Sequence, residues 1–92
     1  MRAVLEECVQ QYYESPQRWE KLAKSQLEML GIEPTLDNAL ALLWGMTYGT
    51  VRTRIWAKVG KVSLDDIKEI TAYVLKEWPK LKEHYIAQRL FQ

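Results

Sequence analysis

The sequence is poor in the residues on which catalytic and metal sites depend. Among its 92 residues there is one cysteine, Cys8, and one histidine, His84. A single cysteine cannot form an internal disulfide, and Cys8 lies among apolar residues at helical spacing, which predicts a buried, inert thiol. The chain has no Cys-x-x-Cys, His-x-x-x-His or Glu-x-x-His pattern of the kind that holds a metal ion. We therefore expect no metal site and no cofactor.

Nucleophilic and phosphate-binding motifs are scarce as well. His84 lies among Lys80, Lys82, Glu83 and Gln88, a pattern typical of an exposed helix face, so we expect a solvated imidazole rather than a general base. Gly45 and Gly49 are not followed by the Lys-Ser or Lys-Thr of a phosphate-binding loop. The sequence predicts no catalytic residue, no small-molecule substrate and no enzyme.

Long apolar runs are also lacking. The longest uncharged stretch, Asn38 to Val51, is shorter than the about 18 residues that a membrane span needs. Glu6 and Glu7 interrupt the region where a signal peptide would need an apolar core. The net charge of +1 argues against coating of nucleic acid or an anionic membrane by bulk electrostatics. These features predict a cytoplasmic protein that does not bind membranes.

The residues that are present predict one helical domain over residues 1–92. Hydrophobic residues make up 48% of the chain, and they recur at helical spacing in residues 2–14, 16–30 and 64–78 and in the central stretch 35–61. Ser15, Thr35 and Ser63 precede these segments as candidate N-caps, and Pro79 is expected to break the last segment in two. No stretch alternates as a strand does. We expect an all-α fold, a small compact bundle of four to six helices.

The central stretch, residues 35–61, is compatible with two structures. On one continuous helix, residues at every fourth position would form a stripe of small side chains against which another helix could pack, namely Ala41, Gly45, Gly49, Thr53 and Ala57. Alternatively the chain turns near Gly45–Thr47, because glycine tolerates a left-handed turn and is a poor helix interior residue. The second alternative gives two short helices joined by a tight turn.

That second alternative resembles the helix-turn-helix of the promoter-reading C-terminal domain of bacterial sigma factors. Thr35 would be the cap, Leu40-Ala41 the apolar-alanine pair, Gly45-Met46 the turn, and Gly49–Ile55 (GTVRTRI) the opening of the recognition helix. The chain departs from the family at Leu42 and Leu43, where polar residues are usual. The resemblance covers residues 35–61 only and implies a small DNA-binding protein or regulator.

A basic patch supports this implication. Between Gly49 and Leu64 there are four basic residues and no acidic one. On a helix with Val51 and Ile55 turned inward, Thr53 points outward between two flanking arginines, which suits phosphate contacts on both sides of a major groove. The predicted contacts to double-stranded DNA are Thr47, Tyr48, Arg52, Thr53, Arg54, Lys58 and Lys61.

A second function remains open, that of a non-catalytic accessory subunit or protein-interaction module, in which a protein partner or a second copy of the chain covers apolar residues. The predicted interface residues are Leu42, Leu43, Trp44 and Trp56. We expect Leu43 and Trp44 to be buried by the first or second helix, or else by a second copy of the chain, since an apolar patch left in water favours association. The backbone at Gly45–Tyr48 separates the two functions, because an unbroken helix there excludes the helix-turn-helix.

Overall fold

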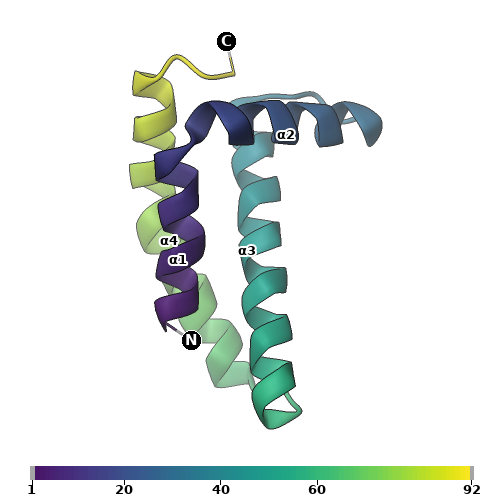
Figure 1. Cartoon of the computed structure of the whole chain (residues 1–92), viewed down its shortest axis with the longest axis vertical. Helices are drawn as coiled ribbons and strands as arrows, with labels where there is room; N and C mark the ends of the chain where they lie inside the picture. The colour runs from purple at the N-terminus through teal and green to yellow at the C-terminus, as the bar shows by residue number, and fades with distance from the viewer. Residues whose placement is uncertain (1, 92) are drawn as a thin grey trace.

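The computed structural model describes residues 2–91 and confirms the all-α prediction. Within that range the chain forms four helices and no strand: α1 (Arg2–Glu14), α2 (Pro16–Met29), α3 (Leu36–Val59) and α4 (Leu64–Ala87) (Figure 1). The molecule is elongated, with extents of 41 × 26 × 18 Å. The number of helices lies at the lower end of the expected four to six.

The helices are arranged as a three-helix body with one crossing helix. α1, α3 and α4 run along the long direction, whereas α2 lies across the upper end of α3 and extends past it (Figure 1). α1 packs against α3 and α4, and α2 packs against α3. The main core lies between α1, α3 and α4 and is formed by Leu5, Val9, Tyr12, Leu40, Leu43, Trp44, Val51, Ile70, Tyr73, Leu81, Tyr85 and Leu90. α2 contributes a second, smaller cluster, Ala23 and Leu27 against Ala39.

α3 is one continuous helix, so the turn that a helix-turn-helix requires at Gly45–Met46 is absent. Leu43 and Val51 are fully buried on the inner side of α3. Each such burial stabilises the helix by about 1.5–3 kcal/mol. Gly45 and Gly49 lie on the outer side and cost about 1 kcal/mol each relative to alanine. Burial outweighs the poor helix propensity of the glycines, and the helix continues through them.

A hydrogen-bond network fixes the same segment. The Thr47 hydroxyl lies 3.0 Å from the carbonyl oxygen of Leu43 and 2.8 Å from the Tyr12 hydroxyl, all of them buried. The Tyr12 hydroxyl also lies 3.0 Å from the Leu43 oxygen. A turn at residues 45–48 would separate these groups and leave buried polar atoms without partners, at a cost of about 1–3 kcal/mol each.

The expected break at Pro79 is wrong, because α4 continues from Leu64 to Ala87 with Pro79 inside it. Leu81 and Tyr85, beyond the proline, are fully buried in the same core as the residues before it. The Tyr85 hydroxyl donates a hydrogen bond of 2.9 Å to the carbonyl oxygen of Tyr12 in α1. These contacts hold the second half of α4 in line and offset the backbone hydrogen bond that proline lacks.

The predicted N-cap hydrogen bonds form at the start of α3 and α4 but not at the start of α2. Thr35 accepts a 3.2 Å hydrogen bond from the Asn38 amide at the start of α3. Ser63 and Asp66 form a reciprocal capping box at the start of α4, with both hydrogen bonds at 3.1 Å. The Ser15 side chain makes no cap hydrogen bond, contrary to expectation, and α2 begins instead with Pro16 in its first turn.

Candidate interaction surface

The residues predicted for contact with partners separate into buried and exposed groups. Leu43, Trp44 and Thr47 lie in the core, with Thr47 at 0% exposure, so these side chains are not available to a partner. Trp44 meets Tyr12 of α1 edge-on, with ring centroids 6.3 Å apart, and stacks on Trp78 of α4 at the same distance. The prediction that the first or second helix covers these residues is confirmed for α1, whose Tyr12 contacts Trp44 and the backbone of Leu43, while the contact of Trp44 with α4 was not predicted.

Two further predicted residues are half-buried and pack inside the molecule. Tyr48 packs against the main core. Leu42 packs against the small cluster formed by Ala23, Leu27 and Ala39. Thr47 and Tyr48, predicted DNA contacts just before the recognition helix expected to open at Gly49–Ile55, therefore lie within α3 and face inward at least in part. The groove-docking geometry of a helix-turn-helix, which needs a tight turn before the recognition helix, is not available here because α3 is continuous.

The basic residues are exposed but do not form one surface. Arg52 lines a hollow with Gly49, Thr53 and Trp56 on the outer face of α3. Arg54 and Lys58 line a different hollow, beside Val4 of α1. The fourth basic residue, Lys61, is exposed in the connection between α3 and α4. The structure thus divides the predicted basic patch between two sides of α3.

Arg54 also has a partner within the chain. Its guanidinium lies 3.6 Å from a carboxylate oxygen of Glu7 in α1, and both side chains are exposed. An exposed pair of this kind contributes about 0–1 kcal/mol, so it orients Arg54 without adding much stability. Any phosphate that bound Arg54 would have to compete with Glu7.

Trp56 is the large side chain left open on α3. Its exposed fraction is 61%, and it lies on the outer side, as the helical spacing predicts. The small residues expected as a stripe, Ala41, Gly45, Gly49, Thr53 and Ala57, are all exposed. A Cβ atom added at Gly45 or Gly49 would meet nothing within 4 Å. The outer side of α3 is therefore a shallow surface with an indole near one end.

α2 adds a second wall that the sequence analysis missed. Leu22 and Leu30 are both exposed, and Met29 has an exposed fraction of 83%. Because α2 crosses α3 rather than lying along it, only a narrow line of residues such as Ala23 and Leu27 reaches the interior. Leu22 and Met29 are two turns apart on one side of α2. Leu22 and Met29 are apolar but lie outside the line of Ala23 and Leu27, and this was the signal in the sequence that could have predicted a second apolar surface on α2.

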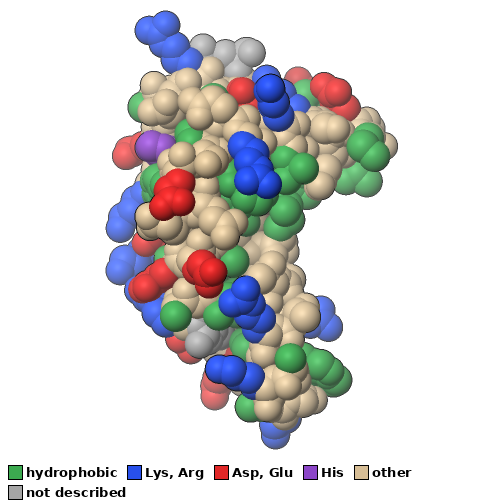
Figure 2. All heavy atoms as spheres, viewed as in Figure 1, with side chains coloured by type: hydrophobic (Ala, Val, Ile, Leu, Met, Phe, Trp, Pro, Cys, Tyr) green, Lys and Arg blue, Asp and Glu red, His purple; other side chains and the backbone are tan. Residues whose placement is uncertain are grey.

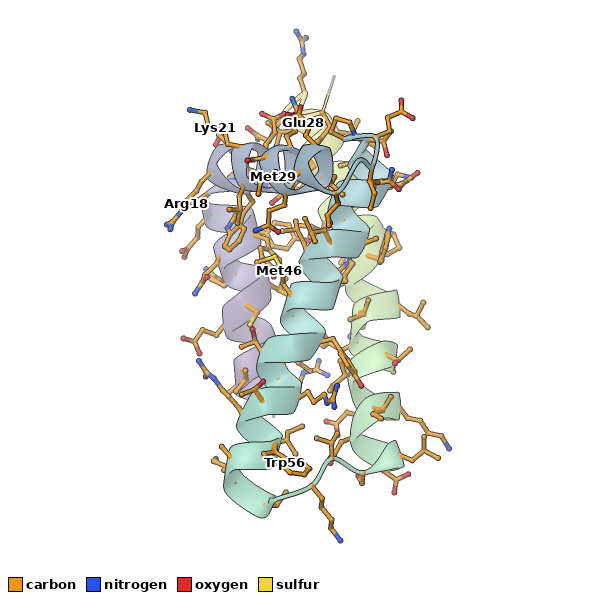
Figure 3. The ribbon with its side chains drawn as sticks, turned by 90° about the vertical axis from the view of Figure 1, so that its right-hand side faces the viewer. Arg18, Lys21, Glu28, Met29, Met46 and Trp56 are labelled. Atoms are coloured by element: carbon orange, nitrogen blue, oxygen red, sulfur yellow. The ribbon has the colours of Figure 1, made fainter. Side chains whose placement is uncertain are left out.

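We use the name α2–α3 face for the outer side of α3, with Gly45, Met46, Gly49, Arg52, Thr53 and Trp56, together with the exposed Leu22 and Met29 of α2. Figure 2 shows a hollow below the overhanging α2, with hydrophobic side chains gathered beneath the overhang. Figure 3 shows Met29, Met46 and Trp56 on the side of the molecule where this hollow opens. No acidic side chain belongs to this face.

His84 and Cys8, the only histidine and cysteine of the chain, are both half-buried between helices. The His84 ring is half-buried against Tyr13, with centroids 4.9 Å apart, and its Nε2 atom is buried without a hydrogen-bond partner. The prediction of a solvated imidazole is therefore wrong, because the unbroken α4 turns His84 toward α1. Cys8 is half-buried, and burial raises the pKa of its thiol above the ordinary value despite the nearby Arg54. A raised pKa disfavours the reactive thiolate.

Within residues 2–91, no three or more His, Cys, Asp or Glu side chains are grouped so as to hold a metal ion. No helix in that range has both the length and the apolar character required to cross a membrane.

Comparison with known proteins found no family model that matches the chain, and no curated protein or solved structure that is similar to it.

Proposed function

We propose that this protein is a non-catalytic, all-helical protein-interaction module, an accessory subunit that binds a protein partner through the α2–α3 face. The observation that carries the proposal is the position of Trp56. The other three tryptophans pack against the interior, whereas Trp56 stands 61% exposed at one end of a concave, apolar surface. An exposed indole beside an arginine is a common composition of an interface hot spot.

The energy available at this residue is sufficient for recognition. A tryptophan buries about 150–250 Å² when covered, and about 25 cal/mol is gained per Å² of apolar surface removed from water. Covering the exposed 61% of Trp56 therefore contributes about 2–4 kcal/mol before entropic costs. That range overlaps the cost of truncating hot-spot residues at protein interfaces, which is about 2 kcal/mol or more. Met29 and Leu22 add apolar area on the facing wall.

Double-stranded DNA binding stays a prediction with less support. It rests on Arg52, Arg54, Lys58 and Lys61 alone, since α3 has no turn at Gly45–Met46. Arg52 lies on one side of α3, Arg54 and Lys58 lie on another, and Lys61 follows the helix, so one straight duplex would contact only some of them. Each phosphate neutralised contributes about −0.9 to the slope of log affinity against log salt. A slope shallower than about −2 would show that the basic residues do not act as one DNA-binding surface.

The experiment that tests the proposed function is site-specific photocrosslinking in the cells that produce the protein, at its natural abundance. A photoreactive amino acid replaces Met29 in one variant and Thr53, beside Trp56, in another, so that Trp56 itself is kept. Lys68, exposed on α4 and outside the α2–α3 face, is the matched control. We expect both face positions to yield the same protein adduct, identified by mass spectrometry, and Lys68 to yield none. Failure of both face positions to capture any protein would contradict the proposal, as would an equal adduct at Lys68.

A further inference from the structure

We propose that residues 88–91, which follow α4 and which we call the strap, hold α2 across α3, and that release of the strap lets α2 move away from α3 while α1, α3 and α4 stay folded. The strap and α2 are then one conformational switch, which controls the α2 side of the α2–α3 face. This inference rests on the proposed function and adds its regulation.

The strap joins the two hydrophobic clusters of the molecule. Leu90 is buried in the main core, and the Phe91 ring lies nearly parallel to the Tyr85 ring, with centroids 6.4 Å apart. Phe91 also packs against the small cluster between α2 and α3, and within residues 2–91 no other half-buried apolar side chain packs against both clusters. In Figure 1 the yellow segment after α4 runs across the top of the molecule towards α2.

Polar contacts also connect the strap to α2. The Phe91 amide donates a hydrogen bond of 2.6 Å to a carboxylate oxygen of Glu20 in α2. Glu20 is paired with Lys24 one turn further along α2, at 3.5 Å, and the Lys24 ammonium lies 5.6 Å from the centre of the Phe91 ring. A hydrogen bond to a charged acceptor is among the stronger ones in proteins. Phe91 is thus held to α2 through both its backbone and its ring.

The strap adopts this position against its own backbone preference. Arg89 has φ +58° and Phe91 has φ +62°, both in the left-handed region. Arg89 occupies the left-handed position of a Schellman cap, where glycine is usual, with the Leu90 amide bonded to the Tyr85 carbonyl oxygen at 3.1 Å. Each left-handed residue with a side chain disfavours the closed strap by about 5- to 30-fold. Such a conformation persists only where surrounding contacts maintain it, and for Phe91 those contacts include α2.

α2 has few buried contacts of its own with the rest of the molecule. Only Ala23 and Leu27 are buried in its cluster with α3. Its start is fixed to α1, because the Trp19 indole donates a hydrogen bond of 3.1 Å to the Gln11 carbonyl oxygen and meets the Tyr12 ring edge-on. Segments with few buried apolar contacts open locally, at a lower free energy than global unfolding. Once the strap leaves Ala23 and Leu27, α2 can therefore pivot about Trp19.

Release of the strap changes the surface on which the proposed interaction depends. Leu22 and Met29 belong to the α2–α3 face because α2 is fixed across α3 (Figures 1 and 3). With the strap open, only the outer side of α3, with Trp56, keeps its position. A partner that contacts both helices binds the closed state more tightly and shifts the equilibrium towards it. By the same linkage, a change that loosens the strap weakens binding of the partner.

Hydrogen exchange of the full chain, followed amide by amide with NMR spectroscopy, tests the switch. We expect the amides of residues 20–29 to share one opening that is more frequent than global unfolding. Phe91→Ala should raise their exchange rate about 10-fold or more, and by more than it raises that of the α3 amides. Ile55→Ala is the matched control, because Ile55 is also half-buried against the main core but belongs to the far end of α3. It should speed exchange of the slowest amides and leave residues 20–29 unchanged.

Arg89→Gly tests whether the strap and α2 open together. Glycine relieves the left-handed strain at this exposed position and leaves the contacts of Phe91 with α2 in place. The closed strap should gain, so exchange of residues 20–29 should slow about 3-fold or more after the greater freedom of glycine in the open state is subtracted. Exchange of residues 20–29 only through global unfolding would overturn the inference. So would an effect of Arg89→Gly confined to residues 88–91, or rates for residues 20–29 that Phe91→Ala leaves unchanged.

The crosslinking experiment separates this inference from the proposed function. In a Phe91→Ala background, the adduct at Met29 should weaken more than the adduct at Thr53, and equal retention of both would show that the strap does not control the face. If the exchange results hold but neither position captures a protein, the strap stands and the proposed function is lost. If both positions capture a protein while α2 shows no opening that depends on the strap, only the strap is lost.

Discussion

Replacing Gly45 or Gly49 by alanine should stabilise this protein, and the sign of the change reports the backbone conformation of α3. Both glycines lie in the helix interior, and a Cβ at either has open space within 4 Å. Alanine is favoured over glycine there by about 1 kcal/mol, through helix propensity and a smaller entropy of the unfolded chain. For a domain of this size, a gain of about 1 kcal/mol raises Tm by about 4–8 °C.

Gly60 is a matched control for this prediction. It too has nothing within 4 Å of an added Cβ, but its φ is +74°, in the left-handed region where alanine is strained. Gly60→Ala should therefore lower the free energy of unfolding by about 1–2 kcal/mol. Urea unfolding followed by circular dichroism, at a protein concentration that keeps the chain monomeric, measures all three variants. Destabilisation by alanine at both Gly45 and Gly49 would refute the reasoning, because it is the result that a left-handed turn in this segment would give.

Three other substitutions test the core, the caps and the buried tyrosine. Thr47→Val should cost about 0.5–1.5 kcal/mol in urea unfolding, because it removes the hydrogen bonds of the Thr47 hydroxyl while the Tyr12 hydroxyl keeps the Leu43 oxygen as its partner; an unchanged stability would contradict this. Ser63→Ala should cost about 1 kcal/mol through loss of the capping box at the start of α4. Ser15→Ala should change the free energy of unfolding by less than about 0.5 kcal/mol, because the Ser15 side chain makes no cap hydrogen bond. Equal effects of the two substitutions would contradict the structure. Burial raises the pKa of Tyr85, so the unfolded chain releases the phenolic proton at a lower pH than the folded chain does. The free energy of unfolding should therefore fall above about pH 10, and it should fall less steeply in Tyr85→Phe. Parallel pH profiles for the two proteins would contradict the burial of this hydroxyl.

The sequence predicts the helices well because their signals are local. Apolar spacing, Pro16 at the start of α2 and the Ser63–Asp66 pair at the start of α4 mark where helices begin, and each acts within one or two turns. The same reasoning fails at Pro79, where the local signal favours a break. The contacts that override it, such as the Tyr85 hydroxyl on the Tyr12 carbonyl, join residues far apart in the chain.

The candidate surface was only partly predictable, for the same reason. The outward position of Trp56 and Thr53 follows from helical geometry alone, and the structure confirms both. The burial of Thr47 and the exposure of Met29 depend on which helix crosses which. Spacing within α2 does not reveal that it lies across the end of α3, so the second wall of the α2–α3 face appears only in three dimensions.

The backbone conformation of Gly45–Tyr48 distinguishes the two functions considered for this chain, because a helix-turn-helix needs a turn there and the α2–α3 face needs a continuous helix. Amide hydrogen exchange measures that conformation directly. A single helix from Leu36 to Val59 predicts that the amides of residues 45–48 exchange as slowly as those of the flanking turns of α3. Their protection should disappear only with global unfolding, since Thr47 is buried within the segment and Leu43 and Val51 are buried on either side of it. Fast exchange confined to residues 45–48 would contradict a continuous α3, and with it the surface on which the proposed interaction depends.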